Sequence, residues 1–422
     1  MSNNPIPLQP SCADDFDPNS LSVREALKRI DLVVKPITGY QRVALRSALG
    51  RVLAETIVSP IAVPAHTNSA VDGYAVRVAD LPQTDVSELR VIGTALAGVP
   101  FSGVVQPGTA VRIMTGAVLP AGADCVVMQE HTERADSWVR IGSGHKAGQN
   151  IRLAGEDLVE GATVMAPGRR LQAADLGVLA SLGVAEVRVR RRLRVAFFST
   201  GDELRSIGET LSEGEIYDSN RYTLYGMLTH LGVELLDMGV VRDRQEDLRQ
   251  ALKDAAANAD AIITSGGVSV GEADFVKDIL AALGAVNFWK IAMKPGRPLA
   301  FGKIGDAVFF GLPGNPVSVM VTYYYFVQPA LRRMMGQTET EAVLVKVPCA
   351  TRLKKRPGRM EFQRGILERQ ADGSLAVRGT GDQGSGILSS VSRANCFIIL
   401  RDELGNLEAG TLVDVQPFEG LM

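Results

Sequence analysis

Between residues 191 and 338, short apolar runs alternate with stretches of helical periodicity. The apolar runs typical of buried strands lie at 195–199, 261–264 and 308–310. Helical periodicity lies at 218–231, 245–257, 273–283 and 317–335. This alternation indicates βαβ units, which build a parallel sheet covered by helices. Because such folds bind ligands beyond the carboxyl ends of their strands, we expect a site in the loops that follow these strands.

The segments on either side have a different pattern. Ser22 followed by Glu25 is a capping pattern that opens a predicted helix at 22–34, and a second helix is predicted at 41–49. Short β-type runs broken by Gly and Pro continue to residue 141, and they return beyond residue 338. We therefore expect a multidomain α/β plus β protein of four parts. These are a discontinuous linker domain (20–57 plus 142–190, with a helix at 170–182), an inserted β-rich domain (58–141), a central three-layer α/β domain with a mostly parallel sheet (191–338), and a barrel-like C-terminal β domain (339–422).

The composition narrows the class of protein. Lys and Arg number 45 and Asp and Glu number 47, so the formal net charge is −2 and the basic excess of a nucleic-acid-binding protein is missing. The four cysteines are far apart and lack the spacing of a zinc or iron–sulfur site. Neither a signal peptide nor a long apolar run is found in the sequence. We expect a cytoplasmic protein with no nucleic-acid partner and no membrane partner.

Three glycine-bearing loops follow the predicted strands, at 199–203, 265–271 and 311–318. Glycine lets backbone N–H groups approach a phosphate, and the N-terminus of a following helix favours the anion. The chain contains neither the dinucleotide-binding G-x-G-x-x-G after a strand nor the P-loop pattern, which argues against a dehydrogenase or a P-loop NTPase. Residues 267–271 match the G-x-S-x-G of a hydrolase nucleophile elbow. All four histidines precede Ser269, however, so the histidine that must follow the serine in such a triad is missing.

Charged side chains supply the other candidate chemistry. Carboxylates that lie beside glycines or in loops could hold Mg²⁺, a hard cation that prefers oxygen ligands, if folding brings them together: Asp72, Asp157, Glu203, Asp243 and Asp274. Lys290, Lys294 and Arg297 supply positive charge on a segment whose prolines predict an extended, ligand-facing loop. The basic run at 190–192 is typical of a solvated linker. Together these features indicate phosphate and metal chemistry rather than hydride transfer.

Seven sequence motifs, which occur in a fixed order along the chain, point to a specific protein family. They are NSAVDGYA at 68–75, IMTGA at 113–117, STGDE at 199–203, IYDSN at 216–220, SGGVSVGEAD at 265–274, KPGRP at 294–298 and GLPGNPVS at 311–318. As a set they resemble molybdopterin molybdenumtransferase, the molybdenum insertase family, which is related to the E domain of gephyrin. The resemblance runs from about residue 20 to the C-terminus.

The resemblance implies an elongated homodimer in which the linker domain dimerises and the α/β domain binds molybdopterin. Enzymes of the family insert molybdate into the dithiolene of adenylylated molybdopterin, require Mg²⁺ and release AMP. The implied substrates are therefore adenylylated molybdopterin and molybdate, and the enzyme that adenylylates molybdopterin is an expected partner.

Matching positions carry the implied roles. The expected catalytic residues are Asp72, Asp157, Glu203, Asp243, Asp274, Lys290 and Lys294, of which Glu203, Asp243 and Asp274 would hold the metal. The expected substrate-binding residues are Thr115, Ser199, Gly201, Asp218, Ser265, Gly266, Gly267, Ser269, Gly271, Pro313, Gly314, Asn315, Pro316, Arg364 and Ser385. Among these, Lys294, Arg364 and Ser385 would meet molybdate, because a dianion favours charge-assisted hydrogen bonds.

Two alternative functions stay open at this point. One is a pterin-binding scaffold, since gephyrin's E domain also organises receptors, and a scaffold would tolerate the loss of Lys294. The other is the preceding adenylyltransferase, whose fold resembles the central α/β part alone. The β-rich segments before and after that part argue against the adenylyltransferase, and ATP consumption without molybdate would favour it.

Overall fold

A computed structural model describes residues 20–267, 274–338 and 341–418. The chain forms two compact units. Unit 1 comprises Met1–Gln41, Gly50–Val52 and Arg190–Met422, and unit 2 comprises Arg42–Leu49 and Leu53–Val189. Each unit is therefore built from segments that are not contiguous in the sequence. The domain boundaries drawn from the sequence stay a prediction.

The centre of unit 1 is a six-stranded sheet. Its order is β16 (Glu234–Val241), β13 (Arg194–Thr200), β17 (Ala261–Ser265), β21 (Ala307–Leu312), β20 (Pro298–Ile304) and β18 (Gly284–Lys290). The first four strands run parallel, as predicted, and the last two are antiparallel. The antiparallel pair was not predicted, because no element was assigned to 284–288 or 299–304; the predicted loop falls mainly on the link between the two strands.

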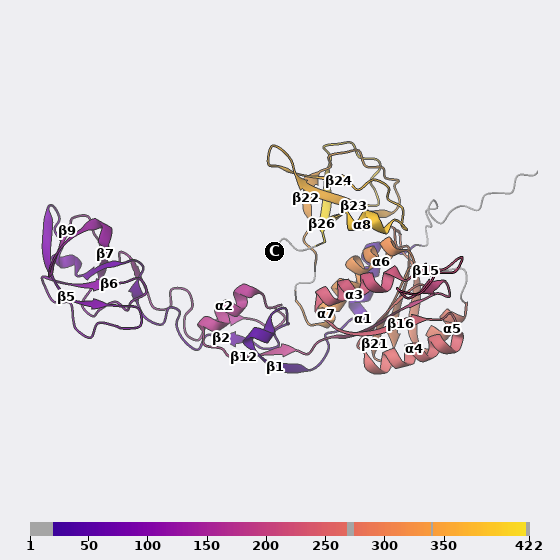
Figure 1. The fold of residues 1–422 in the computed structure, drawn as a ribbon, viewed down its shortest axis with the longest axis horizontal. Coiled ribbons are helices and arrows are strands. Elements are labelled where there is room, and N and C mark those ends of the chain that lie inside the picture. The colour runs from indigo at the N-terminus through magenta and orange to yellow at the C-terminus, as the bar shows by residue number, and fades with distance from the viewer. Residues whose placement is uncertain (1–19, 268–273, 339–340, 419–422) are drawn as a thin grey trace, which may run out of the picture. The chain divides into compact units, whose positions relative to one another are not determined.

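Helices cover both faces of this sheet (Figure 1), which confirms the three-layer arrangement. One face carries α1 (Val23–Val33), α3 (Ser219–Leu231), α6 (Pro316–Thr322) and α7 (Gln328–Met334). The other face carries α4 (Gln245–Asn258) and α5 (Asp274–Leu283). The helix predicted at 317–335 is interrupted by a π-helical turn at Tyr323–Val327. The predicted cap is confirmed, since Ser22 Oγ accepts from the N–H of Glu25 at 3.2 Å.

The C-terminal part of unit 1 is a second sheet that shares its core with the α/β part. Its order is β19 (Met293–Lys294), β23 (Met360–Arg369), β25 (Cys396–Leu400), β26 (Leu412–Pro417) and β22 (Val345–Pro348), with β24 (Leu375–Gly379) also on β23. Strand β19 comes from the α/β segment, and aromatic contacts continue the connection. The ring of Tyr325 lies 4.6 Å from that of Phe362, and the ring of Tyr324 lies 5.9 Å from that of Phe397.

Unit 2 contains the β-rich insertion and a smaller helical part. The insertion is a six-stranded sheet in the order β7 (Cys125–Met128), β4 (Gly73–Val76), β6 (Thr109–Ile113), β5 (Val86–Ala95), β9 (Trp138–Gly142) and β8 (Thr132–Ala135). Helix α2 (Ala173–Ser181) confirms the helix predicted near 170–182. This unit also contains the short pairs β2 (Ile57–Val58) with β11 (Thr163–Met165) and β3 (Asn68–Ser69) with β10 (Ile151–Arg152), and most of strand β12 (Glu186–Arg190).

Two local predictions were wrong. The segment 41–49 is not an α-helix but strand β1 (Tyr40–Ala44) followed by a 3₁₀ turn at Leu45–Ala48. A tertiary hydrogen bond from Leu45 N to Ala185 O (2.9 Å) replaces the helical one, which overrides a weak helix propensity. The basic run is not simply solvated either, because both terminal nitrogens of Arg191 donate to Asp260 at 2.7 Å. Two such parallel bonds make a specific, charge-assisted contact.

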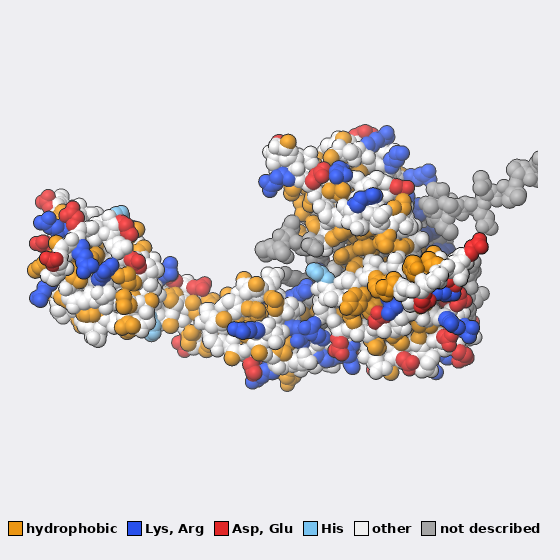
Figure 2. Space-filling model, viewed as in Figure 1, with side chains coloured by type: hydrophobic (Ala, Val, Ile, Leu, Met, Phe, Trp, Pro, Cys, Tyr) orange, Lys and Arg blue, Asp and Glu red, His pale blue; other side chains and the backbone are white. Residues whose placement is uncertain are grey.

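The surface agrees with a near-neutral chain. Figure 2 shows positive and negative side chains interspersed over the face in view. Within the described ranges, no helix has the length and apolar character needed to cross a bilayer.

Candidate functional site

The three predicted loops meet at the carboxyl edge of the parallel strands. The first predicted loop begins at Ser199 within the end of β13, the second begins at Ser265, the last residue of β17, and the third leaves β21 at Pro313. These strands are neighbours in the sheet, with Ser199 opposite Ser265 and Ser265 opposite Leu312. A backbone bond from Gly266 N to Leu312 O (3.2 Å) joins the last two. The structure therefore brings the glycine loops together.

The side chain of Asn220, in the first turn of α3, ties two of these loops together. Its Nδ2 donates to Ser265 Oγ at 2.8 Å and to the carbonyl oxygen of Gly314 at 2.7 Å. Asn220 was not among the predicted site residues, although it ends the IYDSN motif. The position of a small amide two residues after a helix cap is the signal that could have identified it.

Close backbone packing explains the glycines of the second loop. Gly266 and Gly267 have φ of +90° and +67°, in the region that favours glycine. A Cβ on Gly266 would overlap the backbone oxygen of Thr200, and one on Gly267 would lie 2.7 Å from Thr200 Oγ1. Gly314 is exposed and lies against Gly266. These three residues form a side-chain-free surface, which we call the glycine platform.

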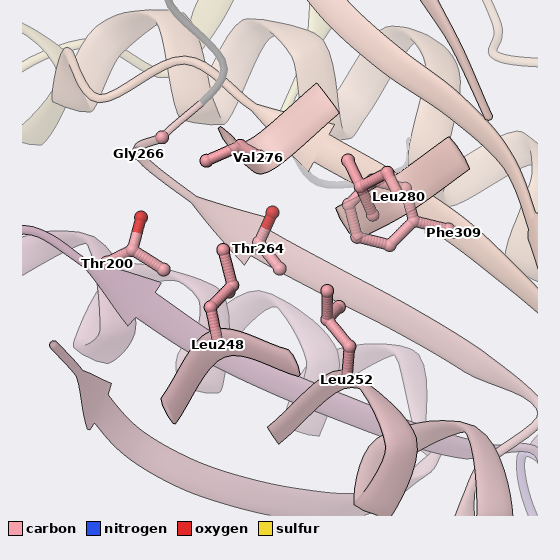
Figure 3. Close-up of a pocket in the computed structure, with 9 residues that line it drawn as sticks. Thr200, Leu248, Leu252, Thr264, Gly266, Val276, Leu280 and Phe309 are labelled. Carbon is pink, nitrogen blue, oxygen red and sulfur yellow. The ribbon is translucent and has the colours of Figure 1, made fainter. Parts of the chain in front are cut away.

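A small cavity lies beneath the platform, between the sheet and helices α4 and α5. Its walls include Thr200, Thr264, Leu248 and Phe309 (Figure 3), and the oxygens of the two threonines point toward the side on which Gly266 lies. Its volume is about 10 Å³, which corresponds to a single water molecule. It is therefore packing space under the loops and not a substrate pocket.

The predicted residues around the first loop are deeply placed. Ser199 and Asp218 are buried, and Ser199 Oγ donates to Asp218 Oδ1 at 3.0 Å. The same oxygen caps α3 by accepting from Arg221 N at 3.1 Å. Asp218 Oδ2 and Thr200 Oγ1 are enclosed and find no hydrogen-bond partner among the described residues. Gly201 is also buried, with φ +150°, where a Cβ would meet the Glu203 carboxylate.

Three carboxylates gather beside this loop. The backbone N–H of Asp243 donates to Asp202 Oδ1 at 3.3 Å. Partial burial, together with the negative charges of Asp202 and Glu203, raises the pKa of Asp243. Across the ranges that the structure describes, no three carboxylate, imidazole or thiol groups lie close enough to hold a metal ion by themselves. Glu203 and Asp243 thus lie in one electrostatic group, whereas Asp202 was not predicted.

Some predicted residues lie wholly or partly outside the described structure. Ser269 and Gly271 fall on residues that are not described. Asp274 is described only as the first residue of α5.

The predicted lysines lie at the end of the antiparallel edge strand β18 and on the short strand β19 that follows it. Lys290 ends β18, is exposed, and accepts a hydrogen bond on its carbonyl oxygen from Leu21 N at 2.7 Å. Lys294 is exposed on β19, where it stands opposite Glu361 of β23. Lys294 therefore lies at the junction of the α/β part with the C-terminal sheet.

The two predicted molybdate residues of the C-terminal sheet have different positions. Arg364 is fully buried, and its guanidinium donates to Ser390 Oγ and to the carbonyl oxygens of Gln383, Asp382 and Gly384, at 2.9, 3.1, 3.3 and 2.9 Å. Burial lowers the pKa of Arg364 to about 10, so the group stays charged at neutral pH. Its donors hold the loop instead of facing solvent.

Ser385 lies in the segment that Arg364 holds. The N–H of Val317, near the start of α6, donates to its carbonyl oxygen at 3.2 Å. Of the predicted third-loop residues, Pro313 is buried, Asn315 is exposed and Pro316 begins α6. The structure therefore places Ser385 against the helix that follows the third glycine loop.

Unit 2 carries the remaining predicted residues. Asp72 Oδ1 accepts from both the backbone N–H and the hydroxyl of Thr115, each at 2.7 Å. The backbone bond, followed by the hydroxyl bond, lowers the pKa of Asp72. Asp72 directly precedes β4 and Thr115 follows β6, and these strands are neighbours in the inserted sheet, so the predicted pair is brought together. Asp157 is exposed in another loop, where its N–H donates to Val63 O at 3.0 Å.

Comparison with protein families divides the chain into three matched regions. Residues 21–183 match the MoeA N-terminal region (domain I and II), 196–333 match a probable molybdopterin binding domain, and 346–418 match the MoeA C-terminal region (domain IV). The glycine loops lie within the second region, and Ser385 lies within the third.

Individual relatives extend over nearly the whole chain. A molybdopterin molybdenumtransferase of Haemophilus influenzae is 47% identical over 90% of this chain and 94% of its own length. A gephyrin of Dictyostelium discoideum is 33% identical over 94% of this chain and 62% of its own length. The crystal structure of a molybdopterin biosynthesis moeA protein from Pyrococcus horikoshii has a TM-score of 0.83, with 31% identity over 94% of this chain and all of the other. The chain therefore belongs to the molybdopterin molybdenumtransferase family, the transferases of molybdenum cofactor biosynthesis.

Proposed function

We propose that this transferase inserts molybdate into the dithiolene of adenylylated molybdopterin and releases AMP. The observation that carries this proposal is the meeting of three glycine-bearing loops at one sheet edge, with Ser385 against the adjoining helix. A bare backbone surface suits the phosphate groups of the adenylylated pterin, because N–H groups can approach an anion without side-chain obstruction.

Different groups of residues would bind the two substrates. The glycine platform and the loop at Ser199–Gly201 would hold the pterin and its phosphates. The exposed ammonium of Lys294 and the hydroxyl of Ser385 would hold molybdate, a dianion, by charge-assisted hydrogen bonds. Arg364 would act on molybdate only through the loop that it holds, because its guanidinium is buried against backbone carbonyls.

Mg²⁺ fits the charge of the carboxylate group beside the first loop. The pKa of Asp243 is raised partly by Asp202 and Glu203, and a divalent cation would relieve that repulsion. Within the described ranges no three carboxylate, imidazole or thiol groups lie close enough to form a complete protein site, so substrate phosphates would have to complete the coordination, as is common for Mg²⁺. We propose that Glu203, Asp243 and Asp274 hold it, and that it polarises the pyrophosphate when bound.

Four further elements belong to the same proposal. They are the homodimer, the substrate-binding role of Thr115, the transfer of substrate from the adenylylating enzyme, and the catalytic roles of Asp72, Asp157, Lys290 and Lys294. Each comes from the family resemblance. The cytoplasmic location also stays a prediction. The scaffold alternative has no support of its own among the contacts described above. The adenylyltransferase alternative is disfavoured, because the family match includes the N-terminal and C-terminal regions that flank the α/β part.

The test is a defined reaction with purified chain, adenylylated molybdopterin, Mg²⁺ and molybdate. We expect AMP release that depends on molybdate, and activation of an apo-molybdoenzyme by the product. A Lys294→Ala variant should raise the molybdate concentration needed for half-maximal rate, whereas Lys303→Ala, an exposed lysine within β20, should not. AMP release that is indifferent to molybdate would contradict the proposed reaction.

A further inference from the structure

Asn220 is held by contacts that fix the orientation of its amide. Its Nδ2 donates to two acceptors, Ser265 Oγ and the carbonyl oxygen of Gly314. The carbonyl oxygen can only accept, so exchanging the amide oxygen and nitrogen would place two acceptors against each other. The observed orientation is therefore the one in which the amide works as a double donor.

The two acceptors belong to different loops. Ser265 ends β17 and precedes Gly266 and Gly267, whereas Gly314 follows β21. The distances of 2.8 and 2.7 Å are at the short end of the range for such hydrogen bonds. One amide group therefore fixes the distance between the second and third loops, which carry the glycine platform. Among the described residues, the longer backbone bond from Gly266 N to Leu312 O, at 3.2 Å, also links these two loops.

The position of Asn220 in α3 is itself well determined. Its helix is capped two residues earlier by Asp218, whose Oδ1 accepts from Arg221 N and from Ser199 Oγ. Through this cap the first loop is connected to the same turn of helix. The first turn of α3 thus contacts all three loops, and Asn220 supplies the contacts to the second and third.

We propose that Asn220 is a positioning residue for substrate binding, which sets the glycine platform at the spacing that accepts a phosphate-bearing pterin nucleotide. This inference rests on the proposed function for its substrate class. Asn220 acts through Gly266, Gly267 and Gly314 and needs no contact of its own with the substrate. Its loss should therefore weaken substrate binding more than it slows the bound reaction.

The experiment measures steady-state AMP release and, separately, the affinity of AMP alone by calorimetry. For Asn220→Ala we expect KM for adenylylated molybdopterin to rise at least about tenfold, with a smaller change in kcat, because two hydrogen bonds are lost. Asn220→Asp keeps the shape and removes both donors, so its KM should rise at least as much. Ser265→Ala removes only one of the two bonds and should give an intermediate increase.

The matched control is Asn258→Ala at the end of α4. Asn258 Nδ2 also donates to a backbone carbonyl, that of Asp254 at 2.8 Å, but lies away from the loops. We expect its KM to equal that of the unaltered chain. A KM for Asn220→Asp within about twofold of the unaltered chain would overturn the inference. If the unaltered chain releases no AMP, the proposed function fails instead, and the AMP affinities of the four variants still decide the role of Asn220.

Discussion

Replacing Arg364 with Lys keeps a positive charge but removes the planar fork that holds the loop at 382–384. In the structure the guanidinium makes four side-chain hydrogen bonds, three of them to backbone carbonyls. An ammonium group on a different stem cannot reach acceptors spread in this way. The substitution therefore tests whether the charge or the hydrogen-bond geometry of Arg364 matters, at a position where the family resemblance implied contact with molybdate.

The expected loss of stability follows from the unmade bonds. We expect at least two of the three carbonyls to lose their donors inside the fold, at about 1–3 kcal/mol each, which lowers the free energy of unfolding by about 2–6 kcal/mol. The loop carries Ser385, whose carbonyl oxygen accepts from Val317 N. Amide protons of the loop should therefore exchange faster, and the molybdate requirement should rise, although the charge is kept.

Hydrogen exchange resolved by residue, together with urea unfolding, measures both effects. The control is Arg378→Lys on β24, a half-exposed arginine paired with Glu368 at 3.1 Å, for which we expect a change within about 0.5 kcal/mol. Unchanged exchange in the loop of Arg364→Lys would refute the positioning role. Normal stability combined with a lost response to molybdate would show that the guanidinium binds the anion directly.

Three further outcomes are expected. Gly266→Ala places a methyl group against the backbone oxygen of the first loop at a left-handed φ, and calorimetry should show AMP binding weakened by about 1–3 kcal/mol. Thr115→Val removes a hydroxyl donor and should raise the pKa of Asp72, which NMR titration measures. A carboxylate with a lowered pKa stabilises the fold above its ordinary pKa, and this stabilisation is lost as pH falls through the lowered pKa. In the variant we expect that loss to occur at a higher pH. Asp202→Asn removes a negative charge and should lower the pKa of Asp243. Because the folded-state pKa of Asp243 is raised, the fold loses stability as pH rises from about 4 through that pKa. We expect unfolding experiments on the variant to show a smaller loss.

Each of these has an outcome that contradicts it. Gly305→Ala, with φ +57° and open space around its Cβ position, is the control for strain alone and should leave AMP binding unchanged. Equal effects at the two glycines would mean that close packing is not the cause. An unchanged Asp72 titration in Thr115→Val, or an unchanged Asp243 titration in Asp202→Asn, would remove the electrostatic argument at that carboxylate.

The fold was predictable where the pattern of burial is local. The strand at 195–199 and the helix that ends before Gly232 could be identified because apolar runs and a left-handed cap leave direct signals in the sequence. Strand β18 could not be identified in this way. Its alternating burial depends on pairing with β20 and on α1, which lies more than 200 residues earlier in the sequence. The missed strand β1 was decided by a tertiary hydrogen bond in the same way.

The site was predictable to the level of its loops. Glycines after strands indicate where a backbone is approached closely, and Gly266 confirms this against Thr200. The roles of Asn220 and Arg364 depend on which loop each side chain contacts, and the residue type alone does not predict those contacts. The sequence alone does not distinguish a buried arginine that binds backbone carbonyls from an exposed arginine that could bind an anion.

The hydrogen bond from Arg190 N to Val52 O, at 2.7 Å, joins two residues between which 137 others intervene, all of them in unit 2. Next to it, Ala54 N donates to Arg188 O at 2.9 Å within unit 2. The polypeptide thus leaves and re-enters unit 1 through neighbouring residues. In architectural terms the intervening stretch is a cassette, which together with Arg42–Leu49 makes up unit 2. Insertion, exchange or removal of that cassette would change unit 2 without interrupting any strand of the six-stranded α/β sheet.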